Sequence, residues 1–357
     1  MKSISFKTKF KQVIFVAIAL LGLLILIWLR QPLTSLPSSD RLETNNISLE
    51  AIEEPIRPIP LKIPLNSEKV KLGEQLFYEV KLSKNETISC ASCHNLKTGG
   101  TDLKSLAIGI DGAIGVFNTS TVFNSGFNVK QFWDGRADNL EEQIEETINS
   151  PNEMNNSSWQ EAIDRIQQSA GYQASFKKIY NSKITSAAIK NALATYVNSL
   201  YTPNSRFDRF LRGDKTAITP REKQGYLRFK TLGCISCHQG VNLGGNMFQS
   251  FGVMTDYLEK SERSKETENP IVTQQRIKRA LRNSALKERD DLLFKVPTMR
   301  NIALTKPYFH DGSAPTLEMA ISVMGESQLG QELSPEDIKL IVEFLNTLTG
   351  EYQGKML

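Results

Sequence analysis

The chain has 357 residues, more than one hydrophobic core usually holds, which predicts two domains of modest size. Hydrophobic residues make up 40% and charged residues 23%, a composition typical of a globular protein. Of the 43 basic residues, five lie in residues 1–30, where there is no acid, so the rest of the chain holds 38 basic residues against all 39 acidic ones. The net charge of +4 therefore belongs to the N-terminus, and a nucleic-acid-binding function is not expected.

The first predicted element is an uncharged run of 17 residues at 13–29. As a helix it would span about 26 Å, close to the ~30 Å hydrocarbon core of a membrane. A cleaved signal peptide is the alternative, with the protein then free in the periplasm, but residues 28–32 lack a small-residue cleavage pattern. We therefore expect residues 1–30 to form a cytoplasmic tip and transmembrane anchor. The four lysines before the run place the remainder on the periplasmic side of the inner membrane.

Residues 31–65 are predicted to form a tether. They contain six of the 14 prolines of the chain. Segments rich in proline are extended and semi-rigid, so we expect this stretch to be exposed and not packed against a domain.

An imperfect repeat follows the tether. Residues 71–77 and 223–229 each predict a helix that contains a glycine, Gly73 or Gly225, where another backbone could cross closely. The second helix has a plausible N-cap, Thr219, followed by proline at the first helical position.

Each of these helices leads into a Cys-x-x-Cys-His string. The strings account for all four cysteines and for two of the three histidines: Cys90, Cys93 and His94, then Cys234, Cys237 and His238. A zinc site or a redox dithiol would also use Cys-x-x-Cys, but here 140 residues separate the strings and a histidine follows each at once. The pattern is the attachment signature of c-type haem, with the histidine as proximal iron ligand. We expect two covalently bound haems, one per cytochrome c-like domain, in residues 66–205 and 206–357.

Further helices are predicted from apolar residues at three- and four-residue spacing in residues 159–169 and 187–200, and after Ser334-Pro335. No alternating pattern is long enough for a major sheet. Residues 256–291 are dense in charge and predict an exposed insertion. The expected fold is all-α, with two cytochrome c-like domains preceded by the transmembrane helix and the proline-rich tether.

Several segments together resemble the bacterial di-haem cytochrome c peroxidase family, and they run from about residue 66 to 350. They are Gln131-Phe132-Trp133-Asp134-Gly135-Arg136, Glu153-Met154-Asn155, Gly240-Val241-Asn242-Leu243-Gly244-Gly245, Pro307-Tyr308-Phe309-His310-Asp311-Gly312, and Met324-Gly325 with Gln328-Leu329-Gly330. The resemblance implies an enzyme that reduces hydrogen peroxide at its N-terminal haem, with electrons supplied through its C-terminal haem.

The resemblance also implies roles for the residues around each haem. His94 would be the proximal ligand of the peroxide-reacting haem, and His238 with Met324 the axial ligands of the electron-transfer haem. Thioether–histidine ligation raises a haem's reduction potential, which suits an electron acceptor, although a methionine alone more often fills a gap in a core. Trp133 would lie between the haems, or be an ordinary core tryptophan. His310 would lie near the haem propionates.

Two further sets of residues follow from the same resemblance. Glu153 matches the family's catalytic glutamate and Gln143 lies ten residues earlier; a carboxylate in a partly dry pocket can carry the proton between the peroxide oxygens, whereas most glutamates are simply solvated. The family's calcium position corresponds to Asn118, Thr305 and Pro307, whose amide and carbonyl oxygens suit that ion.

One position departs from the family pattern. Most members cap the resting N-terminal iron with a second histidine, and the matching segment here reads Ala107-Ile108-Gly109-Ile110. No histidine lies between His94 and His238. We therefore expect an open or water-bound sixth position at rest, and reaction with peroxide without prior reduction.

The expected partners are hydrogen peroxide, a small periplasmic cytochrome c or cupredoxin as electron donor, and the inner membrane; the family is commonly homodimeric. Two other functions compete. A related di-haem enzyme oxidises a side chain of a partner protein, but it has a tyrosine where this chain has Met324. A membrane-anchored electron carrier would need no open iron, and a peroxide sensor would share the same haems.

Overall fold

The computed structural model describes residues 54–254 and 293–357. The predicted anchor at 13–29, most of the predicted tether and the predicted insertion at 256–291 lie outside these residues. Among the helices that are described, none is long and apolar enough to cross a membrane.

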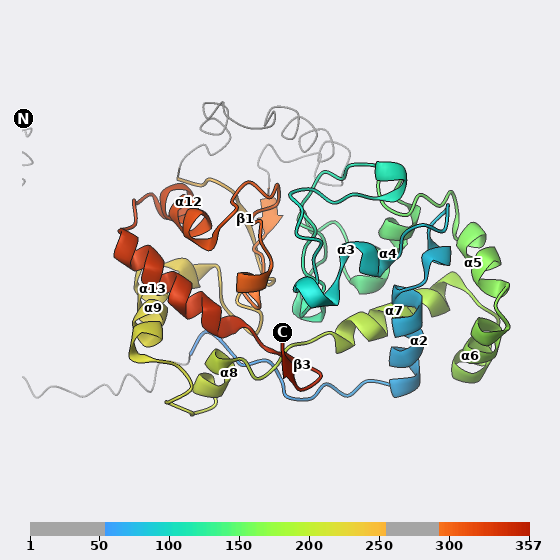
Figure 1. The fold of residues 1–357 in the computed structure, drawn as a ribbon, viewed down its shortest axis with the longest axis horizontal. Coiled ribbons are helices and arrows are strands. Elements are labelled where there is room, and N and C mark those ends of the chain that lie inside the picture. Colours follow the sequence, from blue (N-terminus) through green and yellow to red (C-terminus); the bar gives the residue numbers. More distant parts are fainter. Residues whose placement is uncertain (1–53, 255–292) are drawn as a thin grey trace, which may run out of the picture. The chain divides into compact units, whose positions relative to one another are not determined.

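The described residues are mainly helical, as expected, with only two small antiparallel sheets (Figure 1). The helices are α2 (Ser67–Phe77), α3 (Cys90–Cys93), α4 (Leu140–Asn149), α5 (Trp159–Gln167), α6 (Ala170–Tyr180), α7 (Ser186–Ser199), α8 (Arg206–Leu211), α9 (Pro220–Thr231), α12 (Leu317–Leu329) and α13 (Pro335–Leu345). The strands are β1 (Phe248–Ser250), β2 (Leu293–Lys295), β3 (Glu351–Tyr352) and β4 (Lys355–Met356), and they pair as β1 with β2 and β3 with β4.

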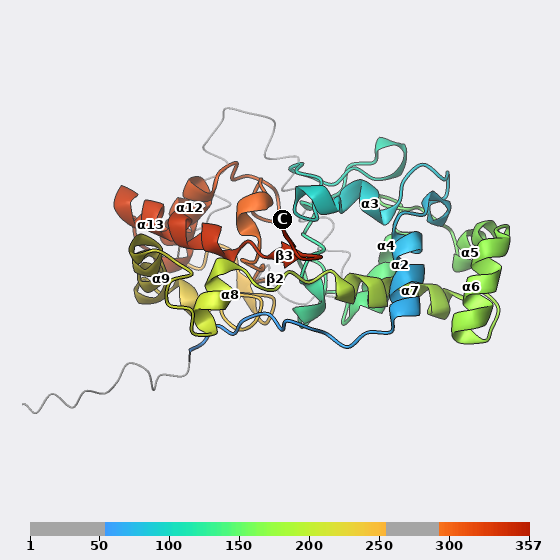
Figure 2. The same cartoon turned by 60° about the horizontal axis from the view of Figure 1, so that its bottom comes forward.

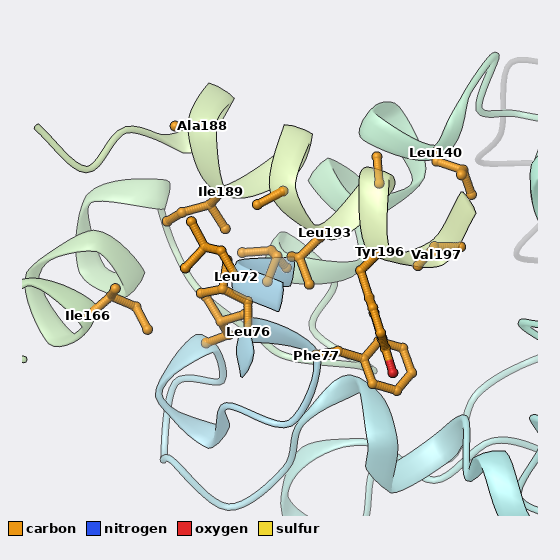
Figure 3. Close-up of a cluster of buried hydrophobic side chains, with 14 of the residues drawn as sticks. Leu72, Leu76, Phe77, Leu140, Ile166, Ala188, Ile189, Leu193, Tyr196 and Val197 are labelled. Atoms are coloured by element: carbon orange, nitrogen blue, oxygen red, sulfur yellow. The ribbon is translucent and has the colours of Figure 1, made fainter. Parts of the chain in front are cut away.

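The first hydrophobic core is built on the crossing of α2 and α7. Leu72, Leu76 and Phe77 of α2 face Leu193 and Tyr196 of α7 (Figure 3). The helices approach closely because α2 has no side chain at its crossing point. A Cβ on Gly73 would lie 2.1 Å from the carbonyl oxygen of Ala192.

The second core repeats this arrangement with α9 and α13, which lie together with α12 in both views (Figure 2). A Cβ on Gly225 would lie 2.0 Å from the carbonyl oxygen of Leu340. Phe207, Tyr226 and Phe344 meet there with ring centroids 4.8–5.0 Å apart. The prediction of a helix with a glycine crossing before each Cys-x-x-Cys-His string is confirmed.

The predicted helix starts are also confirmed. The Thr219 side chain accepts a hydrogen bond from the Glu222 amide, and Pro220 occupies the first turn of α9. Ser334 caps α13 in the same way through the Asp337 amide. These caps satisfy amide groups that have no partner inside the helix.

The tether prediction is wrong for residues 56–59, whereas Leu61 is exposed as expected. Ile56 and Ile59 are 2% and 0% exposed, and Ile56 belongs to the second core. Ile56 forms a parallel bridge with Gly240, and the Ile59 amide donates to Asp208 Oδ1 at 3.2 Å. The proline content does favour an extended backbone, but isoleucines spaced three apart give this segment apolar surface to bury.

Candidate haem sites

The first Cys-x-x-Cys-His string forms a single helical turn, α3, that presents its histidine to a carbonyl group. Ser89 and Ser92 make a reciprocal capping box at the start of the turn. His94 follows the turn, and its Nδ1 lies 3.2 Å from the carbonyl oxygen of Gly100. A carbonyl only accepts, so Nδ1 carries the proton and Nε2 is the nitrogen that would bind a metal. Burial lowers the pKa of His94, which keeps the ring neutral, as an iron ligand must be.

The second string has the same chemistry. A 3₁₀ turn spans Cys234–Ser236 after Gly233, whose φ of 99° suits glycine. Nδ1 of His238 lies 3.3 Å from the carbonyl oxygen of Leu243, and burial lowers the His238 pKa to about 4. Burial thus favours the neutral form of both histidines, as an iron ligand requires.

The four cysteines are not arranged as a disulfide or as a multi-residue metal cluster. None of them pairs with another in a disulfide. Burial raises the pKa of Cys90 to about 12 and those of Cys93 and Cys234 to about 11, so these thiols are neutral at physiological pH. Within residues 54–254 and 293–357 no three His, Cys, Asp or Glu side chains gather to hold a metal ion. The strings fit thioether-bound haem better than zinc.

A cavity of about 460 Å³ opens beside the second string. Cys234, Cys237 and His238 line it, together with Met324 of α12 and apolar side chains such as Ile321. A large apolar cavity with a neutral histidine and a thioether in its wall matches what a haem needs. The structure thus brings together the two residues predicted as axial ligands, although their ligation stays a prediction.

The predicted inter-haem tryptophan and third histidine lie in the wall of the same cavity. Trp133 Nε1 donates to the carbonyl oxygen of Asn118 at 2.9 Å, and the Asn118 amide donates to the carbonyl oxygen of His310 at 2.7 Å. His310 is 5% exposed and stacks on Phe294 with centroids 4.2 Å apart. His310 therefore lies in the wall of this cavity, and its place near the haem propionates stays a prediction.

The three residues predicted to bind calcium also line this cavity: Asn118, Thr305 and Pro307. The Asn118 side-chain nitrogen donates to the carbonyl oxygen of Lys104 at 2.7 Å, so the side-chain oxygen of Asn118 points away from that carbonyl group. The three residues thus share one cavity wall, and calcium binding stays a prediction.

At the first string, the structure places Glu153 beside the segment that departs from the family pattern. The Ile110 amide donates to the Glu153 carbonyl oxygen at 3.0 Å, and Ile110 is 2% exposed. Cys93 Sγ lies 3.8 Å from the carbonyl oxygen of Ile108. A Cβ on Gly109 would lie 1.9 Å from the Asn152 carbonyl oxygen, so only glycine permits this approach.

Opposing interactions raise and lower the pKa of the Glu153 carboxyl group. Burial raises its pKa above the ordinary value, and the charge of Glu146 adds to this. Hydrogen bonds with Thr147 and Ser150 and the charge of Arg136 act in the opposite direction. The net shift of the Glu153 pKa is upward, so its neutral form persists to a higher pH than that of an exposed glutamate.

Gln143 lies on the same helix as Thr147, a hydrogen-bond partner of this carboxyl group. It stands one helical turn before Thr147 on α4, so the two side chains share a face. In the part of the chain that the structure describes, the Gln143 side chain makes no hydrogen bond with Glu153.

Sequence reasoning missed two charged residues that matter here. Arg136 binds Asp134 at 2.9 Å and Glu146 at 2.6 Å, and its guanidinium lies over the Phe132 ring. Lys295 is 7% exposed. The motif around Trp133 could have drawn attention to Arg136, whereas nothing in the sequence separates Lys295 from the other lysines.

Comparisons with known proteins agree with the chemistry of the two strings. A family described as di-haem cytochrome c peroxidase matches residues 67–216. Cytochrome c551 peroxidase of Nitrosomonas europaea is 43% identical, covering 84% of this chain and 86% of that protein. Cytochrome c peroxidase Ccp of Escherichia coli is 41% identical over 88% of this chain, but the match spans only 65% of that longer relative.

Other relatives show how broad the likeness is. Methylamine utilization protein MauG of Methylorubrum extorquens is 31% identical over 82% of each chain. A solved structure of a MauG-like protein associated with microbial copper homeostasis is 28% identical, with a TM-score of 0.68 over 86% of this chain and 96% of that one.

Proposed function

The chain belongs to the di-haem cytochrome c peroxidase family, and on that premise we propose that it reduces hydrogen peroxide to water at the haem of Cys90, Cys93 and His94. Haem iron, when bound, supplies the electrons that break the peroxide bond. Two electrons and two protons convert one peroxide into two waters, so the site must also move protons. The observation that carries the proposal is the position of Glu153 beside Ile110 and the first string.

Glu153 is the residue we assign to proton movement. Its raised pKa lets it take a proton from the near peroxide oxygen and return it to the far one. Thr147 and Ser150 fix the carboxyl group by hydrogen bonds, and Gln143, on the same face of α4 as Thr147, would help to position the oxygens.

We propose further that the sixth position of this iron is open at rest. The buried residue next to Glu153 is Ile110, whose side chain has no atom that can bind iron. The third histidine, His310, is held in the aromatic wall of the other cavity by Phe294. Peroxide could then bind without prior reduction of the second haem.

Electrons would enter through the second haem, held by Cys234, Cys237 and His238 with Met324 as the other axial ligand. A small periplasmic cytochrome c or cupredoxin is the proposed donor. Trp133 lies in the wall of the second cavity, on the motif whose Arg136 acts on Glu153. This position supports Trp133 as the connection between the two haems.

A calcium ion at Asn118, Thr305 and Pro307 is part of the same proposal. Oxygen ligands from two separate segments would fix the cavity wall around Trp133 and His310. Removing calcium with a chelator is then expected to lower the thermal unfolding temperature and slow peroxide turnover. Re-addition of calcium, but not of magnesium, should restore both; unchanged properties would remove calcium from the proposal.

Attachment to the periplasmic face of the inner membrane rests on residues 13–29 alone, and a cleaved leader remains the alternative. A homodimer is proposed only because members of the family are commonly homodimeric. Membrane fractionation and the intact mass of the mature protein would separate an anchored from a cleaved chain.

The decisive test is spectroscopic. Optical and electron paramagnetic resonance spectra of the fully oxidised protein should show one high-spin and one low-spin haem. One equivalent of peroxide, added before any reductant, should remove the high-spin signal at once. Two low-spin haems that ignore peroxide until partial reduction would mean that another ligand caps the first iron.

The same experiment separates the competing functions. An electron carrier would leave peroxide unconsumed in both redox states. An enzyme acting on a partner protein would consume peroxide slowly with small donors; the relatives named MauG keep this alternative open. Met324 in the second cavity favours the peroxidase, since thioether ligation suits electron entry.

A further inference from the structure

Lys295 is a lysine that the fold buries almost completely at the end of β2. Its exposed fraction is 7%, and its amide donates to the Trp133 carbonyl oxygen at 2.7 Å, which fixes its backbone. Burial lowers its pKa to about 8, so the side chain still carries its charge at neutral pH. A buried ammonium group is costly unless an anion lies beside it.

The carboxylate that acts on Lys295, Asp134, is already hydrogen-bonded to an arginine. Lys295 stands opposite Phe248 in the register of β1 and β2, and the Phe248 ring fills the space beneath Gly135. This directs the lysine side chain toward the turn that contains Asp134, whose charge acts on it. Both oxygens of Asp134, however, accept from Arg136 Nη1, at 2.9 and 3.1 Å.

No described residue bonds directly to the Lys295 ammonium group. Arg136 pairs with both Asp134 and Glu146, so these three side chains keep a net charge of −1 that attracts Lys295 from a distance. Within residues 54–254 and 293–357, Lys295 Nζ has neither a salt bridge nor a hydrogen bond. His310, which stacks on the neighbouring Phe294, is held neutral because burial lowers its pKa.

The cofactor can supply the direct partner that Lys295 lacks among the described residues. Lys295 lines the 460 Å³ cavity together with Trp133, His310, Cys237 and His238. Haem carries propionate carboxylates on the edge away from its thioether bonds. We propose that the ammonium group of Lys295 binds a propionate of one of the two haems, positions that haem and stabilises its reduced state. The proposal requires haem at the strings but does not depend on peroxide turnover.

The consequence can be measured as a reduction potential. Reduction adds one negative charge to a haem, and a fixed positive charge nearby favours the reduced state. Loss of that charge lowers the potential, and each tenfold change in the equilibrium constant is 59 mV for one electron. The lysine is thus a positioning residue that acts through the propionate.

The experiment compares Lys295→Met with the unaltered chain, with both haems attached, in a redox titration that follows each haem by its own absorption band. We expect one haem to become at least tenfold harder to reduce, a fall of about 59 mV or more. A shift in the low-spin haem assigns the propionate to the Cys234 and Cys237 site; a shift in the high-spin haem assigns it to the Cys90 and Cys93 site. Lys295→Arg should retain most of the potential.

Two controls keep the outcome clear. Lys339→Met removes the same charge from an exposed position on α13 and should shift neither potential. If Lys295 has no anionic partner, Lys295→Met relieves a burial cost, raises the unfolding temperature and leaves both potentials unchanged, which overturns the proposal. Should Lys295→Met fail to retain haem, recovery of haem by Lys295→Arg but not by Lys295→Gln supports the proposal, and equal failure of all three overturns it.

Discussion

Glu153 is the residue whose removal should affect turnover most. In Glu153→Gln the side chain keeps its size but can no longer accept a proton, so we expect peroxide turnover to fall by about 10²–10⁴-fold. The measurement is steady-state peroxide reduction with an artificial electron donor, with haem content checked by absorbance. Glu74→Gln, on the exposed face of α2, is the matched control. Equal activities for the two variants would assign proton transfer to another group.

The pH dependence of the unaltered protein tests the same residue. The carboxylate form must accept the peroxide proton, and burial raises the pKa of Glu153. The rate of the peroxide reaction should therefore fall as pH drops through this raised pKa, at a higher pH than an ordinary glutamate would give. Glu153→Gln should lose this limb of the profile.

Ile110→His tests the proposal that the sixth position of the first iron is open. It places an imidazole at the buried position next to Glu153, where on that proposal it would bind the iron. We expect the high-spin signal of the oxidised protein to become low-spin and the reaction with peroxide to require prior reduction. Ile114→His changes a residue of the same loop that is 49% exposed and should leave the spectrum high-spin. A high-spin spectrum in both variants would place the distal side elsewhere.

Individual residues were predictable from sequence where a fixed motif encodes them. The two Cys-x-x-Cys-His strings indicate haem attachment through their local spacing alone. Lys295 carries no such signal, because its burial depends on β2 pairing with β1 and on the turn at Asp134, segments far apart in the chain. Side-chain roles that depend on a partner distant in the chain therefore could not be predicted from the sequence.

Among the elements, the crossing of α9 and α13 depends on one missing side chain. Gly225→Ala would place a Cβ 2.0 Å from the Leu340 carbonyl oxygen, so the helices must separate. We expect the free energy of unfolding to fall by about 1–3 kcal/mol, measured by denaturant titration. Gly171→Ala in α6 meets nothing closer than 3.6 Å and should be neutral or slightly stabilising. Similar losses in both variants would mean that helix propensity, and not the crossing, sets the effect.

The same elements show what patterns can and cannot predict. Helices α5, α7, α9 and α13 were predicted because their apolar residues recur at helical spacing or because a capping residue marks their start. Helix α12 was missed, since its apolar residues serve both the cavity and the second core and so follow no single stripe. The packed segment at 54–59 was missed because its partners, Gly240 and Asp208, are distant in sequence.

At the scale of the whole molecule, buried polar contacts join segments of the first and second cores. Asn124 Nδ2 donates to Thr202 Oγ1 at 2.8 Å, and Asn301 Nδ2 donates to the same oxygen at 3.0 Å. All three side chains are at most 1% exposed. Because buried polar groups are costly without partners, this cluster fixes one arrangement of these three segments.

The ion pair between Arg300 and Asp208 fixes the position of the start of the described chain. Both side chains are 0% exposed and 2.8 Å apart. Arg300 also donates to the carbonyl oxygens of Val241, just after the second string, and of Arg57. Asp208 accepts from the Ile59 amide, so a single charge pair ties together α8, the loop after the second string and the segment at 57–59.

Breaking this pair should therefore loosen one particular segment as well as the whole fold. Arg300→Met leaves Asp208 buried and unpaired, and we expect unfolding to become about 3–5 kcal/mol easier. Hydrogen exchange at the Ile59 amide should accelerate more than exchange in α2 or α7, because its acceptor is no longer fixed. Arg221→Met removes an arginine that is 48% exposed and pairs with Glu336 and Glu343, and should cost about 1 kcal/mol or less. If Arg300→Met left Ile59 as protected as before, the segment at 57–59 would be held by the burial of Ile56 and Ile59 alone, and the ion pair would serve only the second core.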